Sequence, residues 1–194
     1  MPPKVRFQQQ NIIDAAFELA RSHGLEAINA RSVASEIGCS TQPIFRVFEN
    51  MDQLKACVLE KAEQCFDVYI NNSRKSQETS YKSVGMAYLL FAMNEPHLFQ
   101  MVFLRCCDNT AAKKKYGCSD HVIDTLVDKS GFNREQAQII HQHMWIYTYG
   151  LAALLMTKQL CYDEAELSRM IDMEYRAIVS GLLWKDADQI HVPS

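Results

Sequence analysis

Proline and glycine are scarce in this chain, with five Pro and seven Gly among 194 residues. So few breaks disfavour a fold of many short strands joined by turns, and they favour helices. No apolar run is long enough to cross a membrane, and the first residues, MPPKVRFQQQ, lack the apolar segment of a secretory signal. We therefore expect a cytoplasmic protein with no membrane partner.

Paired cysteines and catalytic motifs are also missing. The seven Cys are odd in number and form no CxxC motif, which favours reduced thiols; for Cys106 and Cys107 a thiol sensor and inert buried residues both stay open. No Ser/His/Asp order, phosphate-binding loop or GxGxxG motif occurs, so we do not expect an enzyme. His141 and His143 would fall on different faces of a helix, and no metal or other cofactor is predicted.

The chain has no excess of positive charge, since 20 Lys and Arg stand against 23 Asp and Glu for a net charge of −3. Residues 1–50 are neutral as well: the basic residues there are Lys4, Arg6, Arg21, Arg31 and Arg46, and the acidic ones are Asp14, Glu18, Glu26, Glu36 and Glu49. This balance argues against strong nonspecific binding to nucleic acid. The 48% of hydrophobic residues are enough for a substantial core.

Three short helices are predicted in the first quarter of the chain. Apolar residues recur at spacings of three and four between Gln8 and Ser22, which is the pattern of one helical face. A second helix is expected to begin after Asn29 and to end at Gly38. Ser40 or Thr41 can cap a third, whose first turn tolerates the proline. The residues expected to point inward from this third helix are Ile44, Phe45 and Phe48.

Capping boxes mark the starts of three later helices. In each box an Asn or Asp side chain can accept an N–H of the first turn while an acid or amide three residues on reaches back. The boxes begin at Asn50, Asn133 and Asp163, and the helices should run to about Asn71, Gln159 and Lys185. Further helices are expected near residues 80–94, 97–106 and 119–129. The total of about nine helices with no convincing strand predicts an all-α fold.

Two short helices in the first part of the chain, joined by a glycine-containing turn, form a helix-turn-helix pattern. The residues that specify the pattern further are Ile13-Asp-Ala-Ala16, Phe17, Gly24, Arg31-Ser-Val-Ala34, Ile37-Gly-Cys-Ser40, Ile44-Phe45, Phe48 and Leu54. With these residues the segment resembles the N-terminal domain of the TetR family of bacterial transcription regulators. The resemblance implies a helix-turn-helix DNA-binding domain over residues 1–50 and a helical bundle for effector binding and dimerisation over residues 51–194.

The resemblance also implies a function and partners. Such regulators bind double-stranded DNA as homodimers and respond to a small molecule, whose identity is unknown here. The residues expected to contact DNA are Arg31, Ser40, Thr41, Gln42, Pro43, Phe45 and Arg46. Family members often carry Tyr, His and Lys where this chain has Phe45, Val47 and Met51, so three contacts to the DNA backbone are absent or moved. The alternative is therefore a helical ligand-binding or protein-interaction module whose DNA binding is weak or lost.

Two further sets of residues are predicted in the second part of the chain. An apolar effector pocket is expected to include Phe66, Phe103, Trp145 and Tyr149, although most aromatic residues of this region must be core. The last helix is apolar on two adjoining faces, which is more than one monomer core needs. The residues predicted at a dimer interface are Leu167, Ile171, Ile178, Gly181 and Leu182.

Overall fold

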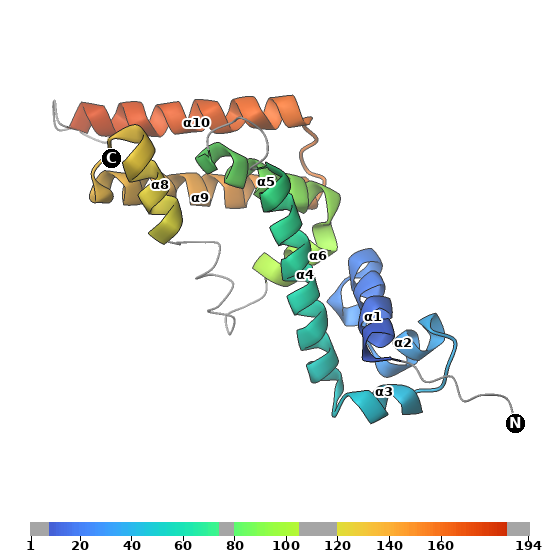
Figure 1. Ribbon diagram of the computed structural model, residues 1–194. Coiled ribbons are helices and arrows are strands. Elements are labelled where there is room, and N and C mark those ends of the chain that lie inside the picture. The colour runs from blue at the N-terminus through green and yellow to red at the C-terminus, as the bar shows by residue number, and fades with distance from the viewer. Residues whose placement is uncertain (1–7, 74–79, 105–119, 186–194) are drawn as a thin grey trace, which may run out of the picture. The chain divides into compact units, whose positions relative to one another are not determined.

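The computed structural model describes residues 8–73, 80–104 and 120–185, and every regular element in these ranges is helical (Figure 1). They contain nine α-helices and one short 3-10 helix, η1, so the predicted all-α class is confirmed. The elements are α1 (Gln9–His23), η1 (Leu25–Ala27), α2 (Ala30–Glu36), α3 (Gln42–Val47), α4 (Met51–Ser73), α5 (Ser80–Asn94), α6 (Pro96–Phe103), α8 (Asp120–Ser130), α9 (Arg134–Met156) and α10 (Glu164–Lys185). Cys106 and Cys107 lie outside the described residues.

Two of the three predicted capping boxes, those at Asn133 and Asp163, are formed in full. The Asn133 side chain accepts the Gln136 N–H at 2.9 Å while the Gln136 side chain accepts the Asn133 N–H at 3.1 Å. Asp163 and Glu166 make the same exchange at the start of α10, at 2.7 and 2.9 Å. At α4 the box is looser, because Gln53 accepts the N–H of Glu49 instead of that of Asn50. Each box satisfies N–H groups that a helix start leaves without intrahelical partners.

Packing divides the chain into two compact units, whose limits differ from the functional boundary at residue 50, which stays a prediction. The N-terminal unit comprises residues 1–68 and 95–106, and the C-terminal unit comprises residues 69–94 and 107–194. The reason is that most of α4 packs in the N-terminal unit, where Leu54, Val58 and Ala62 are fully buried. α6 belongs to the same unit although α5 precedes it in the chain.

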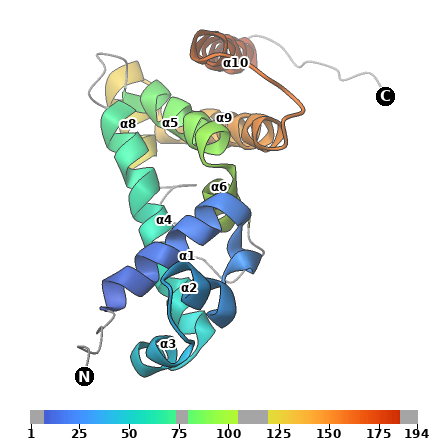
Figure 2. The same ribbon diagram turned by 90° about the vertical axis from the view of Figure 1, so that its right-hand side faces the viewer.

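The core of the N-terminal unit forms on one face of α1. Ile12 and Ala16 of α1 are completely buried, and Phe17 nearly so. Lys61 of α4 lies over the Phe17 ring at 4.6 Å and binds the Asp14 carboxylate, so α4 is held against α1 as Figure 2 shows. α6 also contacts α1. The amphipathic pattern read from the sequence is therefore the pattern that buries α1.

The C-terminal unit is organised around α9. Helices α5, α8 and α10 all contact it, and α5 also contacts α8 and α10 (Figures 1 and 2). The inward face of α9 carries Ala137, Ile140, Met144, Leu151 and Leu155, all buried. In the part of the chain that the structure describes, no helix is both long and apolar enough to span a membrane.

Candidate functional site

Both ends of α2 are fixed by hydrogen bonds, and the bonds at its C-terminal end set the turn to α3. At the start of α2, the Asn29 side chain accepts the N–H groups of Arg31 and Ser32 at 3.1 and 3.0 Å. At its end, Gly38 adopts φ +69° and the Cys39 N–H bonds to the Ala34 carbonyl at 2.9 Å. This is a Schellman motif, in which glycine is favoured because its missing Cβ permits a positive φ. The predicted end of α2 at Gly38 is confirmed.

Helix α3 is short and is anchored by two side chains. Ile44 is fully buried and Phe48, which follows the last residue of α3, is 1% exposed. Phe45 was also expected to point inward, and that prediction is wrong: its side chain is 51% exposed. Successive residues on a helix differ in direction by about 100°, and here Ile44 points into the core while Phe45 points away from it. Thr41 precedes α3, but its side chain makes no capping bond.

The outward face of α3 carries three of the residues predicted to contact DNA. Gln42, Phe45 and Arg46 are exposed, and Phe45 and Arg46 each lie about one turn after Gln42. Arg31 and Ser40 are exposed, while Thr41 and Pro43 are half-buried, as are Val47 and Met51. The Gln42 amide, the Phe45 ring and the Arg46 guanidinium are thus exposed on a helix that Ile44 anchors in the core.

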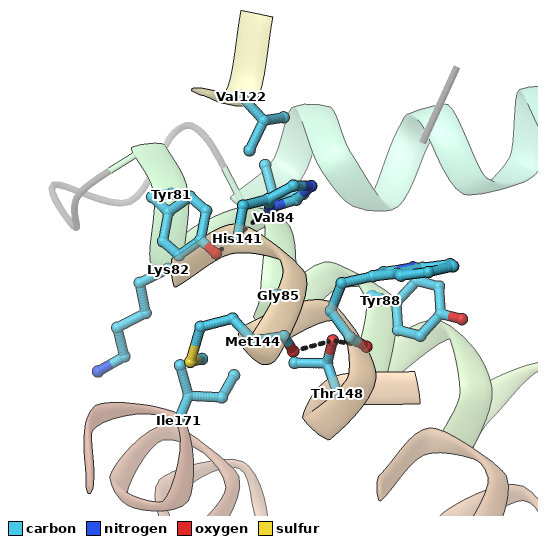
Figure 3. Close-up of a pocket in the computed structure, with 11 residues that line it drawn as sticks. Tyr81, Lys82, Val84, Gly85, Tyr88, Val122, His141, Met144, Thr148 and Ile171 are labelled. Atoms are coloured by element: carbon cyan, nitrogen blue, oxygen red, sulfur yellow. Dashed lines mark hydrogen bonds between the residues drawn. The ribbon is translucent and has the colours of Figure 1, made fainter. Parts of the chain in front are cut away.

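A second candidate site is a cavity in the C-terminal unit (Figure 3). Its volume is about 60 Å³. It lies among α5, α8, α9 and α10. The side chains and backbone that line it come from Tyr81, Lys82, Val84, Gly85, Tyr88, Val122, His141, Met144, Trp145, Thr148 and Ile171.

Polar groups at this cavity are few and engaged. The Tyr81 hydroxyl and His141 Nδ1 are 3.4 Å apart, from α5 and α9 respectively. Burial raises the pKa of the Tyr81 hydroxyl, which therefore stays protonated. Thr148 Oγ1 donates to the Met144 carbonyl at 2.8 Å, and Lys82 Nζ donates to Asp172 at 2.7 Å. The cavity surface is accordingly apolar except near Tyr81 and His141.

Of the four aromatic residues predicted for an effector pocket, Trp145 lines this cavity. Tyr149 packs on Trp145, with ring centroids 6.1 Å apart, and is not among the lining residues. Phe66 and Phe103 lie in the N-terminal unit and pack edge to face at 5.0 Å. Their contact with an effector stays a prediction that this cavity does not support.

Apart from Trp145, the residues that pair α5 with α9 at this cavity were not predicted as pocket residues from the sequence. Tyr81, Gly85 and Tyr88 recur at spacings of four and three, and so do His141, Trp145 and Thr148. The spacing alone indicates one face on each helix. It does not reveal that the two faces meet around a cavity. Among the residues that the structure describes, no group of three or more His, Cys, Asp or Glu side chains could hold a metal ion.

The predicted dimer stripe on α10 is partly wrong. Leu167 and Ile171 are buried within the protomer and have no surface to offer a partner. Ile178 and Leu182 continue the same stripe and are half-buried, while Gly181 is exposed. The sequence showed two apolar faces on this helix but not which of them covers its own core.

These features define an all-helical fold of the helix-turn-helix class, and comparison with known proteins shows what the chain is similar to. Residues 12–56 match the family described as "Bacterial regulatory proteins, tetR family". The uncharacterized HTH-type transcriptional regulator YobS of Bacillus subtilis strain 168 is 21% identical over 94% of this chain and 96% of its own length. The resemblance to TetR-family regulators that the sequence predicted is thus confirmed over the helix-turn-helix region.

Solved structures share the fold over nearly the whole chain. A TetR-like transcriptional regulator from Rhodococcus sp. RHA1 superposes with a TM-score of 0.68 at 11% identity, over 93% of this chain and 99% of that one. The transcriptional regulator FadR from Bacillus subtilis, solved in complex with stearoyl-CoA, gives a TM-score of 0.56 at 16% identity, over 90% and 99%. At these identities the likeness concerns the fold.

Proposed function

We propose that the protein is a repressor that binds a palindromic DNA operator as a homodimer and that a small, apolar effector modulates this binding. The observation that carries the proposal is the outward face of α3, where Gln42, Phe45 and Arg46 are exposed above buried Ile44. An exposed helix face of this kind fits the major groove of B-DNA.

Each exposed residue has a separate role in the proposal. Gln42 stands at the first position of α3 and can bond to N6 and N7 of adenine with its amide. Arg46, one turn later, reaches guanine or a phosphate. Arg31, Ser40 and Thr41 hold the DNA backbone and set the register, as such contacts commonly do. Phe45 offers an apolar surface without the hydroxyl that a tyrosine would carry.

Dimerisation is proposed through the outward faces of the last two helices. On α9, Ile146 is 59% exposed and Leu154 is exposed two turns later. On α10, Met173 is 71% exposed, and Ala177 and Gly181 follow it at spacings of four. Small and apolar residues on adjoining helices can form a four-helix interface with a second copy. Two copies would then present two α3 helices to two half-sites.

The cavity of the C-terminal unit is the proposed effector site. It is concave, mainly apolar and has a small number of convergent polar groups, which is the usual character of a ligand site. The FadR structure with stearoyl-CoA supports the general idea that a regulator of this fold takes a small molecule. Effector binding would change the DNA affinity through a coupling between the two sites.

The test is selection of bound sequences from random DNA, followed by affinity measurements on the selected site at several salt concentrations. Gln42→Ala should relax discrimination at one base pair by ~1–3 kcal/mol. Arg31→Ala should weaken all sequences alike and lower the salt slope by about one phosphate contact. Gln64→Ala, an exposed glutamine of α4, is the matched control and should change neither quantity.

The alternative, a ligand-binding or interaction module without useful DNA binding, predicts a different result. The neutral charge of residues 1–50 and the substitutions at Phe45, Val47 and Met51 favour it. Selection would then yield no enriched sequence even at low salt, and Gln42→Ala and Gln64→Ala would behave identically. That outcome would reject the regulator proposal.

A further inference from the structure

Three large aromatic side chains, those of Tyr81, Tyr88 and Trp145, are among the residues that line the cavity of the C-terminal unit. Tyr81 and Tyr88 come from α5, and Trp145 comes from α9 together with Met144. Figure 3 shows Tyr81, Tyr88 and Met144 around the same space. Aromatic rings and a thioether interact well with the face and edge of another aromatic ring. This part of the lining therefore suits an aromatic ring.

One end of the cavity can exchange hydrogen bonds with a ligand. The Tyr81 hydroxyl is 3.4 Å from His141 Nδ1, longer than the ~2.5–3.0 Å that is usual for a hydroxyl donor. A ligand hydroxyl that replaced or joined this long bond would therefore displace little. Thr148 offers no such group, because its hydroxyl hydrogen is used by the Met144 carbonyl within α9.

The charges around the cavity disfavour an ionic ligand. The Lys82 ammonium is ion-paired with Asp172 at 2.7 Å, so an anion would compete with a carboxylate already in place. A cation would find no carboxylate among the described residues that line the cavity. Burying a charge without a partner is strongly unfavourable. A neutral ligand meets neither obstacle.

The space among the lining side chains suits a group of about one ring, although the cavity is partly open to solvent. Its volume of about 60 Å³ is smaller than the ~150 Å³ of an engineered cavity that binds benzene. A single ring would require a side-chain rearrangement, and Met144 has the flexible side chain to supply it. Gly85 also keeps the site open: a Cβ at this position would lie 3.4 Å from Ile171 Cδ1 and 3.9 Å from Thr148 Cγ2.

We propose that this cavity binds an uncharged, single-ring aromatic compound that carries one hydroxyl group, with the ring between Tyr88 and Trp145 and the hydroxyl at Tyr81 and His141. The inference rests on the proposed function only in taking the cavity as the effector site. It goes further in naming the ligand class, which excludes long acyl thioesters and quaternary ammonium ions.

The test is calorimetric titration of the full-length protein, without DNA, with phenol as the probe. Four comparison ligands each change one property of phenol. Cyclohexanol lacks the aromatic ring, benzoate is negatively charged, phenyltrimethylammonium is positively charged, and lauroyl-CoA is a long acyl thioester. We expect phenol to bind at least tenfold more tightly than any of the first three, and lauroyl-CoA not to compete with it.

Three variants locate the binding. Gly85→Ala adds a methyl group at the cavity and should weaken phenol binding at least tenfold. Gly150→Ala, the matched control, adds the same group to α9 with nothing within 4 Å and should leave binding unchanged. Tyr81→Phe keeps the ring and removes the hydroxyl, so it should weaken phenol binding about three- to tenfold and leave the weaker cyclohexanol binding less affected.

The proposal is overturned if phenol does not bind at millimolar concentrations, if benzoate or phenyltrimethylammonium binds more tightly, or if Gly85→Ala and Tyr81→Phe both bind phenol as the wild type does. A parallel gel shift on a selected DNA site separates the two ideas. Phenol binding with no effect on DNA would reject the effector role and keep the site. If lauroyl-CoA releases DNA and phenol does not bind, the phenol site is rejected and the proposal of a regulator with a small-molecule effector is kept.

Discussion

Loss of the ion pair between Arg21 and Glu95 should measurably destabilise the N-terminal unit. Arg21 Nε donates to Glu95 Oε2 at 2.8 Å, and Arg21 Nη2 donates to the other carboxylate oxygen. The pair joins the last turn of α1 to the residue that precedes α6. The Glu95 side chain is 8% exposed, whereas the Arg21 side chain is 46% exposed. Removing Arg21 would therefore leave a nearly buried carboxylate without its partner.

The expected magnitude follows from this unequal burial. Breaking a fully buried ion pair by removing one partner costs about 3–5 kcal/mol, and exposed pairs are worth about 0–1 kcal/mol. Because water screens the exposed half of Arg21, we expect Arg21→Ala to lower the free energy of unfolding by about 2 kcal/mol. Arg21→Ala combined with Glu95→Gln should be less damaging than Arg21→Ala alone, since the glutamine leaves no buried charge.

Urea unfolding followed by circular dichroism, at one protein concentration, measures the effect. The matched control is Arg134→Ala in α9, whose guanidinium bonds to Asp124 at 2.7 Å with both side chains about half exposed. That substitution should cost no more than about 1 kcal/mol. If Arg21→Ala and Arg134→Ala cost the same, burial of Glu95 is not what makes its pair strong, and the reasoning fails.

Four other substitutions follow from the backbone geometry, an ion pair and a helix cap. Gly38→Ala should lower the free energy of unfolding, measured in urea, by about 1 kcal/mol, because φ is +69° at this residue. Lys158→Gly should raise the free energy of unfolding by roughly 0.5 kcal/mol, because Lys158 has φ +56° at the end of α9. An opposite sign for either would contradict the assignment of strain. The pKa of the Asp14 carboxyl is lowered, chiefly by the hydrogen bond from Lys61. The ionised Asp14 carboxylate therefore stabilises the folded state fully above the ordinary aspartate pKa of about 4. This stabilisation is lost as the pH falls through the lower pKa that Asp14 has in the folded protein. Asp14→Asn should therefore narrow the stability difference between pH 7 and pH 2, and an unchanged difference would exclude this role. Asn133→Ala should lower the free energy of unfolding by about 1 kcal/mol, because it removes the side-chain cap of α9. Circular dichroism during heating should show a lower melting temperature for this variant.

Helix positions could be predicted because their signals are local. The boxes at Asn133 and Asp163 place a cap and its partner three residues apart, and the structure begins α9 and α10 at the next residue. The end of α2 is predictable from Gly38 alone, because glycine readily adopts the positive φ that the turn requires. The 3-10 helix at Leu25–Ala27 was not predicted, since three residues give no periodic pattern.

The candidate sites were predicted less evenly. Exposure of Gln42 and Arg46 follows from the short α3 and its buried anchor Ile44, all within seven residues. The cavity depends on α5 meeting α9, and Tyr81 and His141 are separated by 60 residues. Nothing in either segment alone indicates this pairing. Residue type alone therefore predicts aromatic residues at a pocket, and one of them, Phe66, is buried in the core of the other unit.

The sequence by itself determined the all-α class, the helix ends and the helix-turn-helix family, because caps, periodicity and turn residues act over a few positions. Tertiary structure alone decided which apolar face of α10 is buried, which residues surround the cavity, and that α6 belongs with α1. The physical reason is that burial and ion pairs such as Arg21–Glu95 join residues far apart in the chain, where local preference carries no information about the partner.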